Sequence, residues 1–116
     1  MGKLSPNFER EEFACRCGCG FDTVDAELIK MIQAARDELG PIKINSACRC
    51  EVHNRKVGGA ENSQHKLGRA ADLKPLHTTV DRLWSFLSVN YPESGIGRYN
   101  TFVHLDSRGY KAKWNG

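Results

Sequence analysis

The chain has 116 residues, of which 40% are hydrophobic and 27% are charged, and its net charge is +3. This length suits one domain with one ordinary core, and the composition excludes a disordered chain. The mild positive charge suits approach to an anionic polymer, but it is smaller than nucleic-acid-binding domains usually carry. We therefore expect one monomeric globular domain over residues 1–116 that does not bind nucleic acid.

The N-terminal segment MGKLSPNFEREEF is amphipathic and charged. It lacks the apolar run of a signal peptide, and no later segment is apolar enough to span a membrane, so we expect neither feature. Ser5 and Pro6 predict the start of a short helix toward Phe13, because serine caps helices and proline fits the first helical position.

The chain carries five cysteines, which are Cys15, Cys17, Cys19, Cys48 and Cys50. The glycines of CRCGCG break any regular period and predict a loop. An odd number of cysteines without an export signal favours thiols or metal ligands over a disulfide framework. The C-x-C spacings differ from the C-x-x-C of zinc knuckles and favour packing thiols. A second, structural metal site and one disulfide remain alternatives.

Residues 24–39, VDAELIKMIQAARDEL, show the clearest helical period in the chain. Their apolar residues fall on one stripe, and Gly40 and Pro41 are stop signals. The next segment, PIKINSAC, alternates like a strand with Ile42 and Ile44 on one face.

The second half of the chain alternates between polar connections and regular elements. EVHNRKVGGAENS predicts a long loop, and RAADLK predicts a strand. Thr78 and Asp81 form a capping-box pattern before a second helix. GIGRY and TFVHLD predict an antiparallel hairpin joined through Asn100. This order predicts an α+β domain, with one antiparallel sheet covered by two main helices.

Strand alternation places several metal-competent side chains together. Asp72 should face away from the core side of its strand, and His104 and Asp106 should share one face of another strand. His65 lies just before the first of these strands, and the KLG turn can bring it back to the same cleft. Three N and O ligands plus one open position are typical of a catalytic zinc. Ordinary, partly buried histidines and a salt-bridging aspartate give the same spacing, so both readings stay open.

Two longer motifs occur in a specific order. NSACRCEVHNRKVGGAENSQHKLGRAADL contains S-x-H-x-x-G-x-A-x-D, and GIGRYNTFVHLDSRG contains V-H-x-D, ahead of Trp114. With these motifs the chain, from about Phe8 onward, resembles the zinc D-Ala-D-Ala carboxypeptidase family, and more closely its small phage-encoded and bacterial peptidoglycan peptidases. The resemblance implies a fold of the hedgehog and D-Ala-D-Ala carboxypeptidase type, with zinc bound by His65, Asp72 and His104.

The same resemblance implies that Arg49, in SACRC, holds a carboxylate of the substrate peptide. A planar guanidinium binds carboxylates at two points, which suits this role, and a surface salt bridge is the alternative. Ser63 either contacts the substrate or caps the turn before His65.

The general base is where the sequence departs from the family pattern. Relatives carry an acid three positions before the last ligand histidine, where this chain has Thr101, whose hydroxyl cannot accept a proton near neutral pH. We predict that Asp106 is the base, because it shares a strand face with His104, and its alternative role is to orient a ligand histidine. Glu61 and Glu93, in expected loops, are further candidates.

These features predict a zinc peptidase that hydrolyses peptide bonds in peptidoglycan stem peptides, as a carboxypeptidase or an endopeptidase. Without a signal peptide, it is expected to be made in the cytoplasm of a bacterial or phage-infected cell and to act on the cell wall, as a phage endolysin does. The alternative function is a non-catalytic, zinc-containing binding module on the same fold, which Thr101 keeps open.

Overall fold

The computed structural model describes residues 3–116. Two short strands, β1 and β2, form a separate hairpin, and five strands form one sheet in the order β3-β4-β6-β5-β7. The elements in chain order are β1 (Lys3–Ser5), β2 (Phe8–Glu9), the 3-10 helix η1 (Arg10–Phe13), α1 (Ala26–Leu39), β3 (Ile42–Ser46), α2 (Glu51–Lys56), the 3-10 helix η2 (Gln64–Leu67), β4 (Ala70–Pro75), α3 (Val80–Asn90), β5 (Gly95–Arg98), β6 (Val103–Asp106) and β7 (Ala112–Asn115).

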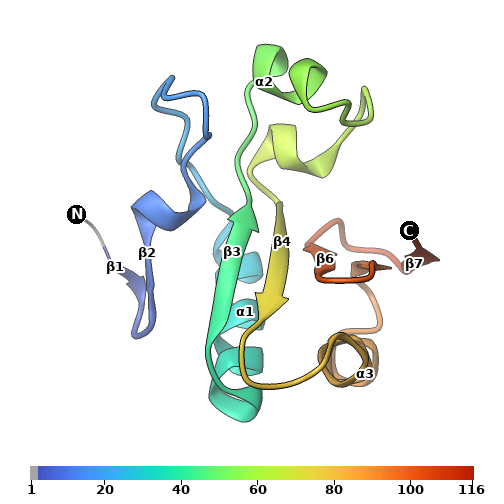
Figure 1. Ribbon diagram of the computed structural model, residues 1–116. Coiled ribbons are helices and arrows are strands. Elements are labelled where there is room, and N and C mark those ends of the chain that lie inside the picture. Colours follow the sequence, from blue (N-terminus) through green and yellow to red (C-terminus); the bar gives the residue numbers. More distant parts are fainter. Residues whose placement is uncertain (1–2) are drawn as a thin grey trace.

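The two long helices build the core with the sheet, as their periodicity predicts. Leu28 and Ile32 of α1 and Leu87 of α3 are fully buried in one cluster with Leu73 and Leu105 from the sheet. Figure 1 shows α1 behind β3 and β4, while α2 stands beyond the carboxyl end of β3. The predicted α+β domain with two covering helices is confirmed.

The sheet is mixed rather than wholly antiparallel. Strands β3, β4, β6 and β5 pair antiparallel, which includes the predicted β5–β6 hairpin, but β7 pairs with β5 in parallel. The chain reverses after β6, but both neighbours of β6 are already in place, so β7 pairs with the free edge of β5. The sequence analysis missed β7 because the strand has only four residues, none of them fully buried, and Trp114 is its single large apolar side chain.

Three local predictions were wrong. The second predicted helix, α3, is capped by Thr79, whose hydroxyl accepts from the Arg82 amide at 3.1 Å, and not by a capping box of Thr78 and Asp81. Ser5 and Pro6 do not start a helix, because Pro6 lies in the turn between β1 and β2, and the Ser5 hydroxyl donates to Gln33 Oε1 at 2.7 Å. The segment expected to be one long loop contains α2, whose N-cap is Cys50. Among residues 3–116, no helix has the length and apolar character needed to cross a membrane.

Candidate metal centre

His65, Asp72 and His104 come together on the side of the sheet away from the core. Asp72 of β4 is the register partner of His104 of β6, so the two side chains stand next to each other across the sheet. His65 lies in η2, directly before β4. Its Nε2 is 3.3 Å from Asp72 Oδ1, and His104 Nδ1 is 3.2 Å from the same oxygen. The three predicted ligands therefore share one point.

The spacing of these atoms fits a tetrahedral zinc ion. Zinc–nitrogen and zinc–oxygen bonds of about 2.0–2.1 Å place neighbouring tetrahedral ligands about 3.3 Å apart. The three ligand atoms all lie within 4.8 Å of one another, and the two contacts to Asp72 match that tetrahedral edge. Three ligands leave the fourth position open, which is the arrangement of catalytic rather than structural zinc.

Both histidines are held so that one ring nitrogen faces Asp72. His65 Nδ1 lies 2.6 Å from the Ala47 carbonyl oxygen, which can only accept, so Nδ1 carries the proton and Nε2 is the free ligand atom. His104 Nε2 lies 2.7 Å from Asp106 Oδ2, which leaves Nδ1 toward Asp72. Metal-binding histidines are usually fixed in this way through their second nitrogen.

Electrostatics keep the carboxylates of the site ionised. Burial opposes ionisation, but hydrogen bonds from His104 and His65 outweigh it and hold the pKa of Asp72 well below its usual range. Burial likewise lowers the pKa of His104, but Asp106 and Asp72 outweigh it and raise that pKa overall. The two carboxylates therefore stabilise the protonated, positively charged form of His104, which lies between Asp72 and Asp106.

A row of residues across the sheet completes the wall beside His104. In register, Gly97 of β5 lies between His104 of β6 and Trp114 of β7. A β-carbon at Gly97 would lie 2.4 Å from Trp114 Nε1, so only glycine lets the indole cross the sheet here. The rings of His104 and Trp114 then lie 5.1 Å apart, and Trp114 Nε1 donates to Tyr99 Oη at 3.0 Å.

The three predicted ligands line a cleft of about 480 Å³ that also contains the predicted substrate residues. Arg49 donates to Asp72 Oδ2 at 3.4 Å and to Asn54 Oδ1 at 3.2 Å, so its guanidinium lies beside the ligands. Ser63 lines the cleft as well, and its hydroxyl accepts a hydrogen bond from the His65 amide, which is the capping role. A larger cavity of about 700 Å³ lies beside α1, but none of the three ligands lines it.

Asp106 lies behind His104 rather than in the cleft. It is fully buried, and Arg108 donates to both of its oxygens, at 2.8 Å and 2.7 Å. Burial opposes ionisation, yet the hydrogen bonds from His104 and Arg108 hold the pKa of Asp106 below its usual range. This placement matches the alternative role of orienting His104, and the general-base role of Asp106 stays a prediction.

Sequence reasoning missed three large cleft residues, Tyr99, Phe102 and Arg108, and gave no reason for Trp114. Arg108 extends from Asp106 toward Trp114, with its guanidinium carbon 5.4 Å from the indole ring. Glycines at alternate positions of GIGRY were the available signal, because Gly95 and Gly97 leave space for Asp106 and Trp114 respectively. Thr101, Glu61 and Glu93 do not line the cleft.

Comparison with known proteins agrees with this geometry. The sequence pattern of the Peptidase M15 family matches residues 6–106, which include all three predicted zinc ligands and Asp106. No curated protein matches the chain. The M15 family consists of zinc-dependent metallopeptidases with a hedgehog and D-Ala-D-Ala peptidase fold, which agrees with the small α+β domain seen here. The chain therefore belongs to the Peptidase M15 family.

Proposed function

We propose that this M15 peptidase hydrolyses peptide bonds in peptidoglycan stem peptides at the bacterial cell wall. The observation that carries the proposal is that Arg49 lies in the same cleft as His65, Asp72 and His104. A substrate carboxylate bound by Arg49 would place the adjoining peptide bond against the ligands. Stem peptides offer such carboxylates, and the net charge of +3 favours approach to an anionic wall.

The residues in the cleft and directly behind it have tasks that follow from their contacts. When bound, zinc supplies Lewis-acid polarisation of the scissile carbonyl and activation of water. Asn54 holds the Arg49 guanidinium in place, and two-point binding then orients the substrate. Asp106 and the Ala47 carbonyl oxygen fix the ring orientations of the two histidines. The stacked rings of Tyr99 and Phe102, 4.5 Å apart, form one wall of the cleft.

Release of soluble fragments from purified cell walls tests this proposal. The protein should release peptides without chelator and none after chelation, and mass spectrometry of the muropeptides identifies the bond that is cut. His104→Ala should abolish release. His77→Ala is the matched control, because His77 is exposed and does not line the cleft. Intact zinc content with neither released peptides nor released amino acid would refute the peptidase proposal.

A binding module without catalysis is the second candidate function. Of the described residues that line the cleft, Asp72 is the only carboxylate, and Asp72 is itself a predicted metal ligand. Thr101 replaces the acid that relatives use as the base. Sedimentation of the protein with cell walls, with no fragment release, would favour this second function.

A further inference from the structure

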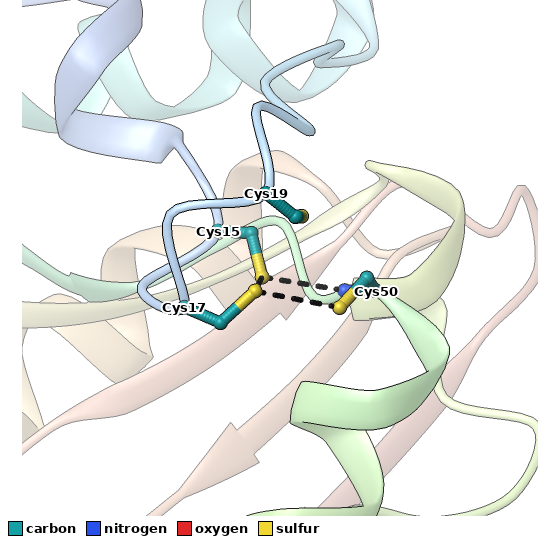
Figure 2. Close-up of side chains that lie close together, drawn as sticks. All are labelled: Cys15, Cys17, Cys19 and Cys50. Carbon is teal, nitrogen blue, oxygen red and sulfur yellow. Dashed lines mark hydrogen bonds between the residues drawn. The ribbon is translucent and has the colours of Figure 1, made fainter.

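Four of the five cysteines converge at a second point, outside the cleft. Cys15, Cys17 and Cys19 lie on the loop between η1 and α1, and Cys50 is the N-cap of α2. Their sulfur atoms all lie within 4.8 Å of one another (Figure 2). Cys17 Sγ is 3.4 Å from Cys15 Sγ and 3.6 Å from Cys50 Sγ. The expectation that these residues are only packing thiols does not explain this convergence, because Cys17 and Cys19 are exposed.

We propose that Cys15, Cys17, Cys19 and Cys50 form a structural zinc site with four thiolate ligands. Zinc–sulfur bonds of about 2.3 Å place tetrahedral thiolates about 3.8 Å apart, close to the two observed contacts. Four sulfur ligands in a tetrahedral arrangement suit zinc, or iron with sulfide, and leave no open position for catalysis. Binding releases the thiol protons, so the four ligands enter as thiolates.

Backbone amides already point at two of the sulfurs. The Cys50 amide lies 3.4 Å from Cys15 Sγ, and the His53 amide lies 3.4 Å from Cys50 Sγ. Such N–H donors stabilise negative charge on sulfur. Burial raises the pKa of the Cys15 thiol, but hydrogen bonds from its cysteine neighbours outweigh this and lower the pKa to about 7. Hydrogen bonds with Cys15, Cys19 and Cys50 raise the pKa of the Cys17 thiol to about 12, so these contacts favour a thiolate at Cys15 and a protonated thiol at Cys17.

The loop is shaped to return three cysteines to one place. Gly18 and Gly20 have φ values of 82° and 93°, a left-handed conformation that glycine adopts without strain. The Gly18 amide donates to the Cys15 carbonyl oxygen at 3.2 Å, and the Cys15 amide donates to the Phe21 carbonyl oxygen at 2.8 Å. These turns explain how ligands with C-x-C spacing can reach a common centre, which the sequence analysis considered unfavourable.

Disulfides explain the arrangement less well. A disulfide joins two sulfurs at about 2.05 Å, whereas all five cysteines here are free and three sulfurs crowd around Cys17. Each disulfide would join only two cysteines, so disulfide formation would not require all four sulfur atoms to lie at one point. Cys48 is the exception, since it is buried apart from the cluster and donates to the Thr23 carbonyl oxygen at 3.4 Å.

The proposed zinc would join two distant segments beside the active site. Cys15 and Cys50 are 35 residues apart, and closing a loop of this length stabilises the folded state. Arg49 precedes Cys50 directly, and its amide donates to the His65 carbonyl oxygen at 3.0 Å. The ion would therefore hold the chain on which both Arg49 and α2 depend. The metal site itself does not rest on the peptidase proposal.

Metal content measured by mass spectrometry on protein purified under reducing conditions tests this inference. The parent chain should contain two zinc ions, one for each cluster. Cys17→Ser should contain one, and it should fold because Cys17 is exposed. Cys48→Ala is the matched control and should keep two. His104→Ala should also contain one, so the two sites are counted separately.

Cobalt substitution provides a second measurement. Cobalt–thiolate absorption in the near ultraviolet should appear in the parent, in Cys48→Ala and in His104→Ala, and be lost in Cys17→Ser. One zinc in the reduced parent, together with a mass lower by two hydrogen atoms per disulfide in protein purified without reductant, would overturn the inference. Iron in place of zinc would overturn the choice of metal. If His104→Ala and the parent bind equal amounts of zinc, the assignment of a metal centre to His65, Asp72 and His104 is wrong, and the proposal for the cysteine site still stands.

Discussion

His65, Asp72 and His104 project from paired strands and an adjoining turn, whereas the four clustered cysteines project from a loop and the start of a short helix. Strand pairing places Asp72 beside His104 whether or not an ion is present, and hydrogen bonds then fix both histidine rings. No strand pairing holds the four clustered cysteines in place. Cys17 and Cys19 are exposed, and their positions depend on turns of a glycine-rich loop.

This difference separates two uses of a metal. A preformed centre can keep an open coordination position, because the fold rather than the ion positions the ligands. At a metal site built on a loop, part of the free energy of metal binding offsets the cost of ordering the chain. Four thiolates also fill the coordination sphere and leave no open position. We therefore expect changes at the first centre to act on turnover and changes at the second to act on stability.

The largest effect is expected from loss of a ligand in the His-Asp-His centre. Asp72→Asn should remove most zinc and reduce peptide release to background, because Asp72 bridges both histidines. Zinc analysis and the cell-wall assay measure the two effects. Full turnover in Asp72→Asn would remove this residue from the centre.

Asp106→Asn distinguishes the two roles considered for Asp106. The contacts with His104 and Arg108 favour orientation of the histidine, so zinc affinity should fall about 10- to 100-fold. Competition with a chelator measures that affinity, and a thermal melt measures the cost of leaving Arg108 unpaired. A general base gives a different result, with zinc retained and turnover lower by about 100- to 10,000-fold.

Arg49→Lys should lower kcat/KM by about 10- to 100-fold, because a charged hydrogen bond contributes about 1.5–3 kcal/mol and a lysine cannot bind a carboxylate at two points. Zinc content should remain that of the parent. Arg55→Lys is the matched control, since Arg55 is exposed on α2 and does not line the cleft. If both variants have the same kcat/KM, Arg49 does not bind the substrate carboxylate.

The smallest effect on turnover is expected from Cys17→Ser. Under zinc-saturated conditions its kcat should fall only a few-fold, because strand pairing and the adjoining η2 position His65, Asp72 and His104 independently of the cysteine cluster. Its melting temperature should fall by several degrees, as expected when about 1–2 kcal/mol of stability is lost from a domain of this size. A large loss of turnover without a change in melting would mean that the cysteine cluster takes part in the chemistry.

The order of the main elements was accessible from the sequence because helices and strands have local periods. The stripe of α1 and the alternation of β4 and β6 depend only on neighbouring residues, so they placed Asp72 and His104 opposite the core-facing side chains. The KLG turn brought His65 to the same cleft, and the family motifs added the zinc-ligand role of the three residues and the role expected of Arg49. Short polar elements such as α2 were missed because six residues give too little periodicity.

Long-range pairing decided the remaining features. Strand register, rather than spacing in the sequence, brought Trp114 across Gly97. Alternation along β6 had already placed Asp106 on the face of His104, but only the folded structure showed that Arg108 holds it there, behind the cleft. The edge strand β7 runs parallel to β5 because the positions beside β6 were already filled. Cys50 meets Cys15 across 35 residues because β3 and α2 carry it there. Contacts of this kind depend on how whole helices and strands pack against one another, so they cannot be predicted from the local periodicity of the sequence.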